Sequence, residues 1–347
     1  MPGKRLFLAV FVLIMTVCYI TACLPLEPSV PDTDETDIDE DGDDTDPDEN
    51  DNENPPTENN PMLKLTASAG SGSAYDLIRV NGFDYETPDQ TVLGGTGGHV
   101  EFGPHILQQY DETLGKNVFA FVMHHAVDRN ATGDWRRQRV EIKIDHRNNI
   151  DNPGRDFCGL PGADESRSFI HRWKFKLPDD FVVSSSFTHL HQIKNEGGAD
   201  SAQPIVVLTA RIANGVNRMQ LAYYAPGTSS PTNWINDNNH LLADYLGQWV
   251  QCEETITYSS DTAIAAYSIK ITRISDNRVL MNYTAAPNSI ITWREGQTHG
   301  RPKFGLYRTI FSGNNPGNFT EPASANLIPG LKDETILFAD FEIVRLK

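Results

Sequence analysis

The feature that most constrains this chain is a series of short segments, from about Met62 to Lys347, in which apolar and polar residues alternate. Alternation with a period of two indicates β-strands with one buried face. No long segment shows the 3.6-residue period of an amphipathic helix. Clusters of Gly, Pro, Asn and Asp separate the segments, as in tight turns. The clearest alternating segments are RVEIKIDH, FIHRWKFKL, THLHQIK, SIKITRI, KFGLYRTIF and ILFADFEIV.

This pattern predicts an all-β fold. Its length of about 285 residues suits one large β-sandwich better than two domains. Two antiparallel sheets arranged as a jelly roll would leave one concave face, which is a natural place for a groove that binds substrate. We therefore expect residues 62–347 to form a single β-jelly-roll domain.

The first 22 residues differ from the rest of the chain. Lys4 and Arg5 precede the apolar run LFLAVFVLIMTVCYI, and the small residues of ITAC end at Cys23. A charged start, an apolar run and a small-residue cleavage site are typical of a secretory signal peptide. The cysteine at its end resembles a bacterial lipoprotein signal, which implies lipidation of Cys23. The residue after it, Leu24, implies an outer-membrane lipoprotein, on the cell surface or the periplasmic face. A plain secretory signal or an anchor helix is the alternative.

Residues 23–61 contain almost no apolar side chains after the first few positions, and this composition predicts a disordered linker. The segment carries 16 of the 47 acidic residues. Without them, and without Lys4 and Arg5, 31 acidic and 27 basic residues remain, so most of the net charge of −18 belongs to the linker. A nearly balanced domain can hold a local basic cleft for an anionic polymer. Asp37–Asp48 resembles a calcium-binding loop, but a solvated spacer is the preferred interpretation.

Two of the four cysteines belong to the predicted folded domain, Cys158 and Cys252. An exported domain permits a disulfide between them, and two buried thiols are the alternative. No cysteine spacing of the zinc-binding type occurs. The sequence calls for no cofactor, and it leaves a structural calcium ion open.

Three alternating segments carry rows of polar side chains that a sandwich core does not require. In RVEIKIDHR, the core face is expected to consist of Val140, Ile142 and Ile144. The opposite face would carry Arg139, Glu141, Lys143 and Asp145. Taken alone, such a row is equally compatible with a solvated outer face. In THLHQIKN, one face would carry Leu190, Gln192 and Lys194, and the other His189, His191 and Ile193. In PKFGLYR, Lys303, Gly305 and Tyr307 share a face.

In chain order these segments read R-x-E-x-K, then Q-I-K, then K-x-G-x-Y, which resembles the jelly-roll (concanavalin A-like) polysaccharide lyases. Alginate lyases of this fold carry R-x-E-x-R, Q-I-H and Y-x-K-x-G-x-Y strands. Here Lys194 stands in place of the histidine, and Arg301 in place of the first tyrosine. At these positions the sequence resembles the ulvan lyases more closely than the alginate lyases. Glucuronan lyases and heparin-lyase-like domains are close alternatives.

The resemblance implies a lyase that cleaves a uronic-acid polysaccharide by β-elimination. Arg139, Gln192 and Lys194 would neutralise the sugar carboxylate, and Tyr307 would act as base and acid. His189 or His191 would assist if proton and leaving group lie on opposite sides of the ring, which a β-bulge would permit. His124 and His125 are further candidates for that role. The expected substrate-binding residues are Lys303, Glu141, Lys143 and Arg308, although Arg308 points away from the groove on a regular strand.

Gly305 would leave room for the sugar chain, and Glu141 would orient Arg139. Extra cations for a sulfated polymer are available at Arg136, Arg137, Arg147, Arg155, Arg211 and Arg294. The rival from another class is a non-catalytic carbohydrate-binding lipoprotein with an aromatic platform of Trp135, Trp234 and Trp293. The sequence has no stripe of basic residues that would indicate nucleic-acid binding. The expected partners are an anionic polysaccharide and, through the lipid, a membrane, with the protein a monomer.

Overall fold

The computed structural model describes residues 63–70, 72–88, 103–125, 128, 136–145, 167–311 and 327–346. The chain divides into Met1–Pro55 and Pro56–Lys347, and every described residue belongs to the second unit. The predictions for the signal peptide, Cys23, the acidic linker and the calcium-type loop lie outside the described residues, as do those for Trp135, Arg147, Arg155 and Cys158. Within the described part, no helix has the length and apolarity that crossing a membrane requires.

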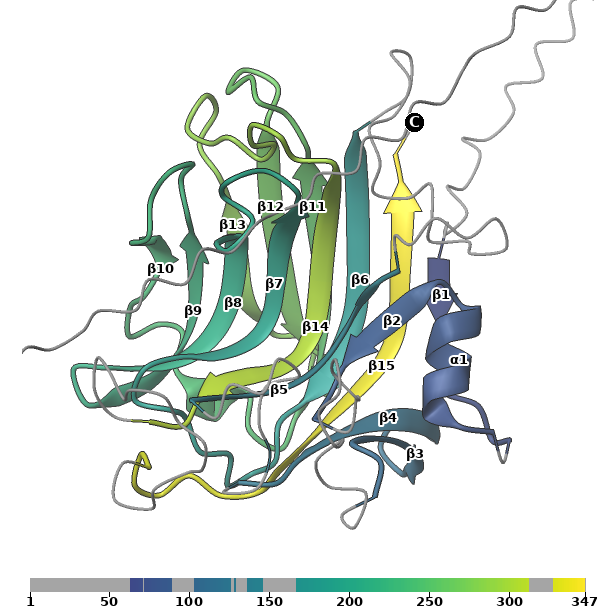
Figure 1. Cartoon of the computed structure of the whole chain (residues 1–347). Coiled ribbons are helices and arrows are strands. Elements are labelled where there is room, and N and C mark those ends of the chain that lie inside the picture. Colours follow the sequence, from purple (N-terminus) through teal and green to yellow (C-terminus); the bar gives the residue numbers. More distant parts are fainter. Residues whose placement is uncertain are drawn as a thin grey trace, which may run out of the picture. The chain divides into compact units, whose positions relative to one another are not determined.

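The described residues form two antiparallel sheets that face each other, so the predicted all-β jelly-roll sandwich is confirmed (Figure 1). The eight-stranded sheet runs in the order β13-β12-β11-β6-β15-β4-β3, with β1 paired to β15. Its strands are β1 (Leu63–Leu65), β3 (Ile106–Asp111), β4 (Lys116–Met123), β6 (Ser168–Lys176), β11 (Trp249–Thr257), β12 (Ala266–Arg273), β13 (Val279–Thr284) and β15 (Glu334–Arg345).

The seven-stranded sheet runs in the order β10-β9-β8-β7-β14-β5-β2. Its strands are β2 (Phe83–Glu86), β5 (Arg137–Ile144), β7 (Thr188–Glu196), β8 (Pro204–Ala213), β9 (Val216–Tyr223), β10 (Thr232–Ile235) and β14 (His299–Thr309). In the described part of the chain, a short helix, α1 (Ala74–Val80), packs beside β2 and β3, and a 3-10 turn, η2 (Leu242–Asp244), follows β10. The three polar segments of the sequence therefore lie on the adjacent strands β5, β14 and β7.

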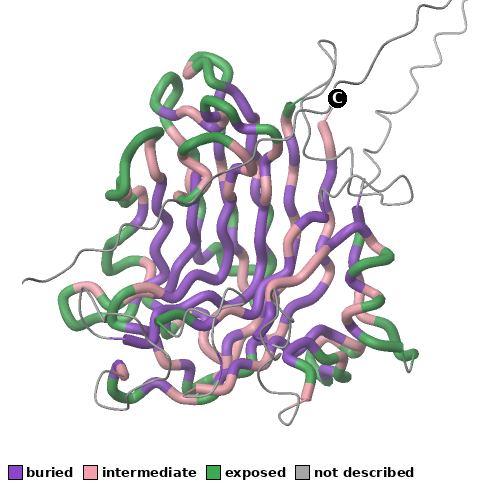
Figure 2. Tube along the Cα trace, viewed as in Figure 1, coloured by how far each residue is buried: buried purple, intermediate pink, exposed green. Residues whose placement is uncertain are grey.

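The core fills the space between the sheets, where the strands are buried along most of their length (Figure 2). Val140, Ile142 and Ile144 of β5 are fully buried, which confirms the core face predicted for that strand. Aromatic rings from the eight-stranded sheet, such as Phe338, pack in the same core as Phe304 of β14. Burial of a side chain of this size stabilises the fold by about 1.5–3 kcal/mol. This packing fixes which faces of β5 and β14 turn away from the core.

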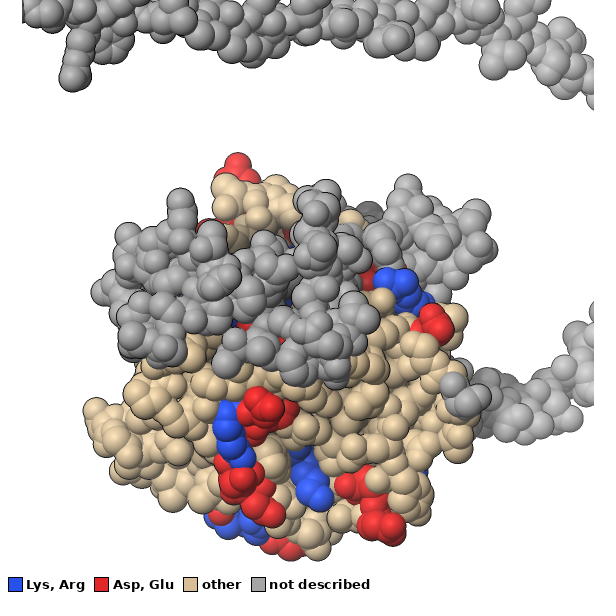
Figure 3. Space-filling model, turned by 60° about the horizontal axis from the view of Figure 1, so that its bottom comes forward, with Lys and Arg blue, Asp and Glu red and all other residues tan. Residues whose placement is uncertain are grey.

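Cys252 of β11 is also fully buried in this core. It has no disulfide partner among the described residues, and Cys158 lies outside them, so the predicted pairing stays a prediction. Charges on the surface are mixed in sign: on the face shown in Figure 3, basic and acidic residues lie close to one another over a largely uncharged background. This agrees with the nearly balanced charge of the folded domain.

Candidate active site

A pocket of about 570 Å³ lies on the face of the seven-stranded sheet that points away from the core. Its basic lining residues are Arg137, Arg139, Lys194 and Arg211, and none of its described lining residues is acidic. His189, Gln192 and Tyr307 also line it. The structure thus gathers five of the six predicted catalytic residues in one place. The sixth, His191, lies elsewhere.

An irregularity in β7 separates the two histidines. His189 pairs with Thr209 of β8 and His191 pairs with Leu208, so Leu190 is an extra residue without a partner on β8. Such a bulge reverses the side-chain alternation at one point of a strand. His189 therefore points into the pocket together with Gln192 and Lys194, instead of lying on the opposite face as strict alternation would place it.

His191 is buried in the core, which corrects its prediction as a catalytic candidate. Its ring packs against Trp173 and Phe304, with centroids 4.5 and 4.7 Å away. Its Nε2 lies 3.0 Å from Oε2 of Glu254, which also contacts Nδ1 of His171 at 2.7 Å. His191 thus belongs to a buried polar group between the sheets and cannot reach a substrate in the pocket.

The strand β14 carries the matching irregularity. It pairs regularly with β5, Tyr307 opposite Arg139 and Gly305 opposite Glu141. Towards β7, in contrast, Gly305 and Leu306 together face the single residue Leu190. As a result Tyr307 lies directly opposite both Arg139 and His189.

Gly305 has a structural role different from the predicted one of leaving room for a sugar. Its φ is +146°, which favours glycine, and an added Cβ would lie 2.2 Å from the carbonyl oxygen of Val140. The same Cβ would lie 2.6 Å from Cα of Glu141. The glycine is therefore required because the backbones of β14 and β5 approach too closely for any side chain.

Tyr307 lies between two guanidinium groups and is 6% exposed. Nη1 of Arg137 donates a hydrogen bond of 2.8 Å to its phenolic oxygen. The guanidinium carbon of Arg139 lies 3.9 Å from the centroid of its ring. The ring of His189 is 5.9 Å away, and Phe187 packs against both rings. Both guanidinium groups thus contact Tyr307, one at its hydroxyl and the other at the face of its ring.

Two acidic residues next to Arg139 hold it in place. Glu141 Oε2 lies 3.2 Å from Nε of Arg139, and Glu86 of β2 pairs with another nitrogen of the same guanidinium. Gln192 Nε2 donates a hydrogen bond of 2.6 Å to Oε1 of Glu141. Glu141 thus orients both Arg139 and Gln192, and the remaining N–H of the Gln192 amide can serve a ligand.

Two of the predicted substrate-binding lysines pair with these acidic residues. Lys303 is 1% exposed, and its ammonium lies 2.7 Å from Glu86 and 3.9 Å from Glu141. Lys143 lies 3.0 Å from Glu86. Neither lysine lines the pocket. The prediction that Lys303 binds a neighbouring sugar is therefore corrected, because Glu86 neutralises its charge. Burial alone would raise the pKa of Glu86, but Lys303, Arg139 and Lys143 outweigh it and hold that pKa well below its usual range.

The charge states of two pocket residues follow from burial. Desolvation, followed by the charges of Arg139 and Arg137, lowers the pKa of His189 to about 3. Its imidazole is therefore neutral near pH 7, and a pKa this low makes it a weak base. Desolvation, followed by the charges of Arg139 and Arg301, lowers the pKa of Lys194 to about 8. Lys194 is still mostly protonated at pH 7, and a bound anion would hold it so.

Several other predicted residues lie away from the pocket. Arg308 is fully buried and donates hydrogen bonds to Gln138 Oε1 and to the carbonyl of Lys332, which corrects its assignment to substrate binding. Arg294 is also buried and donates to backbone carbonyls, among them Pro204 and Tyr224. His124 and His125 follow β4 and do not line the pocket.

The aromatic platform of a binding module is not formed by the described tryptophans. Trp234 stacks on Tyr223 and Tyr283, with centroids 5.1 and 4.9 Å away, and it packs against the core. Trp293 is also partly buried against the core.

Two important residues were not found from the sequence. Glu86 ends an edge strand far from the recognised segments, and no motif marks it. Arg137 was noted only as a spare cation, although it precedes Arg139 by two residues and so shares its face on a regular strand. The spacing of two residues could have identified Arg137 as a neighbour of Arg139 on the pocket face.

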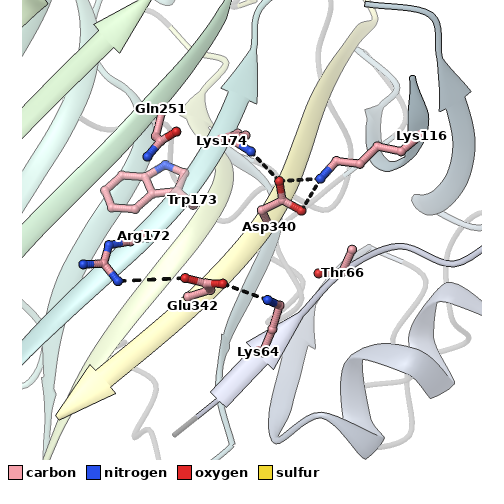
Figure 4. A pocket seen from close by; sticks show the side chains of 9 residues that line it. All are labelled: Lys64, Thr66, Lys116, Arg172, Trp173, Lys174, Gln251, Asp340 and Glu342. Atoms are coloured by element: carbon pink, nitrogen blue, oxygen red, sulfur yellow. Dashed lines mark hydrogen bonds and ion pairs between the residues drawn. The ribbon is translucent and has the colours of Figure 1, made fainter. Parts of the chain in front are cut away.

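A second hollow, of about 340 Å³, lies on the outer face of the eight-stranded sheet (Figure 4). Its cations are paired: Lys116 and Lys174 both contact Asp340, and Lys64 lies 3.0 Å from Glu342. It contains no tyrosine or histidine among its described lining residues. The hollow therefore lacks the acid–base groups that the first pocket has.

No family model and no curated protein matches this chain. Solved structures do resemble it. An endo-β-1,4-glucuronan lyase from the fungus Trichoderma reesei is 12% identical with a TM-score of 0.45, and the match covers 83% of this chain and 96% of that one. An alginate lyase from Klebsiella pneumoniae is 9% identical with a TM-score of 0.49, covering 78% and 98%. An alginate lyase from Pseudomonas aeruginosa is 13% identical with a TM-score of 0.42, covering 76% and 97%. At such identities, function has to be argued from the side chains of the pocket.

Proposed function

We propose that the protein is a polysaccharide lyase that cleaves a uronic-acid polymer by β-elimination, in the pocket formed by β5, β7 and β14. One observation carries the proposal: a pocket with four basic and no acidic described lining residues surrounds a tyrosine whose hydroxyl is hydrogen-bonded to Arg137. The cations suit an anionic substrate, and the phenol supplies an acid–base group beside them.

The reaction requires neutralisation of the sugar carboxylate. The C5–H bond breaks, a C4=C5 double bond forms, and the C4–O bond breaks to release the leaving oxygen. Removal of the C5 proton places a second negative charge next to the carboxylate, so donors aimed at that group lower the barrier. Arg139, Gln192 and Lys194 would fill this role, and their position in the pocket lining, on two strands on either side of β14, supports it. Glu141 and Glu86 fix the guanidinium before substrate arrives.

Tyr307 is the proposed base. Arg137 and Arg139 stabilise the phenolate that would take the C5 proton. When the C5 hydrogen and the leaving oxygen lie on the same side of the ring, the protonated Tyr307 then protonates that oxygen. When they lie on opposite sides, His189, which also lines the pocket, would accept the C5 proton and Tyr307 would act as the acid. The proton balance closes in both cases.

The substrate we favour is ulvan, in which glucuronate or iduronate neighbours sulfated rhamnose. Arg137 and Arg211 add positive charge beyond the three carboxylate-neutralising groups, which a sulfate would use. Lys194 at the position of the alginate-lyase histidine supports the same choice. Glucuronan, alginate and heparin-type polymers are the alternatives. Glycoside hydrolysis with two carboxylates fits less well, because the described pocket lining offers none.

The test is a panel of ulvan, glucuronan, alginate and heparin-type polymers, each followed by the ultraviolet absorbance of the conjugated product. We expect activity on one or more of them. Tyr307→Phe should lower kcat/KM by about 10²–10⁴-fold, the usual contribution of a proton-transfer group. Tyr110→Phe is the control, because Tyr110 is 57% exposed on β3 in the other sheet. Binding without any product in the wild type would favour the carbohydrate-binding alternative, and full activity of Tyr307→Phe would remove Tyr307 from the mechanism.

We further propose that the enzyme is a monomeric outer-membrane lipoprotein, anchored through Cys23 and separated from the membrane by the acidic linker. The motif at Cys23 and the linker composition support this location. Fractionation of cells expressing the wild type and Cys23→Ser tests it. The substituted protein should leave the membrane fraction, and an unchanged distribution would contradict lipid anchoring.

A further inference from the structure

Two histidines and an aspartate converge at one end of the β3–β4 pair, away from the residues that line the pocket. His105 directly precedes β3, His124 directly follows β4, and Asp128 lies four residues further on. His105 and Asp128 are fully buried, and the side chain of His124 is 17% exposed. We propose that His105, His124 and Asp128 form a binding site for a divalent transition-metal ion of the zinc type.

The spacing of the donor atoms fits a tetrahedral ion. With metal–nitrogen bonds of about 2.0–2.1 Å, ligand atoms around a tetrahedral zinc lie roughly 3.3 Å from one another. His105 Nε2 lies 3.4 Å from His124 Nδ1 and 2.9 Å from Asp128 Oδ1. His124 Nδ1 lies 3.5 Å from Asp128 Oδ2. The two ring nitrogens and one carboxylate oxygen of Asp128 lie within 4.8 Å of one another, so an ion can be placed among them, and water can fill the fourth position.

The ligand types fit the same class of ion. Two imidazole nitrogens and one carboxylate oxygen suit zinc and its neighbours in the first transition row, whereas calcium and magnesium prefer oxygen ligands only. The two imidazole rings meet nearly at right angles, with an interplanar angle of 81° and centroids 5.1 Å apart. This places one nitrogen of each ring towards the other without stacking the rings.

Surrounding hydrogen bonds fix these ligands. The backbone N–H of His124 donates to Oδ2 of Asp128 at 2.6 Å, which leaves Oδ1 directed towards His105. Gln138 Nε2 donates to the carbonyls of His124 and Asp128 at 2.8 and 3.2 Å. Supporting contacts of this kind orient the ligands of metal sites. Since Gln138 lies between Arg137 and Arg139 on β5, a bound ion would also brace the strand that carries the pocket cations.

The other group of this composition, His171, His191 and Glu254, is a weaker candidate. Both histidines contact the same carboxylate oxygen, and the second oxygen accepts a hydrogen bond of 2.7 Å from Tyr267. All three ligand residues are fully buried, so an ion would have no path of entry. The partly exposed ring of His124 supplies such a path at the first site.

The experiment measures zinc binding by the untagged full-length protein. The protein is stripped with a chelator, dialysed, and titrated with zinc by calorimetry, while its thermal unfolding is followed with and without zinc. We expect one equivalent to bind and the melting temperature to rise with zinc concentration, because an ion that binds only the folded state stabilises it. Cobalt substitution should give the visible absorption bands of a tetrahedral site.

Two variants locate the ion. His124→Ala removes a partly exposed ligand and should weaken zinc binding by more than the roughly 10–100-fold that changes in supporting residues cost. His240→Ala is the matched control, because Nδ1 of His240 lies 2.7 Å from Asp237 in a surface His–Asp pair outside the cluster, and it should bind zinc like the wild type. Asp128→Asn, which keeps the side-chain size, provides a second ligand change if His124→Ala unfolds.

Three outcomes would overturn the proposal. The first is a wild type that neither binds zinc nor gains thermal stability from it. The second is a His124→Ala protein that is folded and retains full affinity, which would place the ion at another site such as the fully buried cluster. The third is an octahedral spectrum with cobalt. None of these results depends on whether the protein has lyase activity.

Discussion

The substitution Gly305→Ala tests whether the close contact between β14 and β5 creates the site. The added Cβ would lie 2.2 Å from the Val140 carbonyl oxygen and 2.6 Å from Cα of Glu141, and both atoms belong to backbone that cannot rotate away. A non-glycine residue at a φ of +146° costs about 1–3 kcal/mol. Overpacking costs about 1–3 kcal/mol more. We therefore expect the free energy of unfolding to fall by about 2–6 kcal/mol.

The assay is denaturant unfolding of Gly305→Ala and of Gly72→Ala, the matched control. A Cβ at Gly72 would meet nothing within 4 Å, so this variant should stay within about 1 kcal/mol of the wild type. Where Gly305→Ala remains folded, its kcat should also fall, because Tyr307 and Arg139 face each other across the same strand pair. A displacement of about 1 Å can cost 10²-fold in rate. A Gly305→Ala protein as stable and active as Gly72→Ala would refute the reasoning.

Two further predictions concern charge. Lys194 loses its proton as the pH rises through about 8, so kcat/KM for an anionic polymer should fall above that pH. Lys194→Arg should move this fall to higher pH, because the guanidinium stays protonated. An unchanged pH profile would exclude Lys194 as the origin of the fall. Glu86→Gln removes the nearer counter-charge of the buried Lys303 and should lower the free energy of unfolding by about 3–5 kcal/mol at pH 7. The pair of Glu342 with the exposed Lys64 should contribute less, so Glu342→Gln should cost less than about 1 kcal/mol. Because the pKa of Glu86 is lowered, its contribution to the free energy of unfolding is present above the pKa of unfolded glutamate, about 4.3, and is lost as the pH falls through the folded-state pKa. Both variants are compared by denaturant unfolding, and equal losses of unfolding free energy would contradict the assigned roles.

The fold was predictable because alternation reports directly on which side chains face the core. Val140, Ile142 and Ile144 identified the buried face of β5, and the polar row on its other face followed. The three polar segments could be grouped only through the resemblance to lyases. Their adjacency as β5, β14 and β7 depends on strand order, which the sequence does not express.

The roles of individual charges were less predictable, because pairing depends on residues that come together only in the fold. Lys303 shares a face with Tyr307, as its spacing indicates, yet it is buried against Glu86 from a strand more than 200 positions earlier in the chain. Arg308 likewise finds its partner in Gln138. A periodic pattern assigns a face to each side chain, but the partner that neutralises its charge comes from another strand.

The two histidines of β7 show why the site needs irregular backbone. In a regular strand His189 and His191 share one face, and both would enter the core, where His191 packs against Phe304 and contacts Glu254. The unpaired Leu190 turns His189 to the other side, and Gly305 lets β14 follow the same shift while staying in register with β5. His189, Tyr307 and Arg139 then stand side by side although their strands obey different alternation. The reactive geometry therefore depends on one extra residue, Leu190, and on the absence of a side chain at Gly305. A pattern of alternating apolar and polar residues does not reveal either feature.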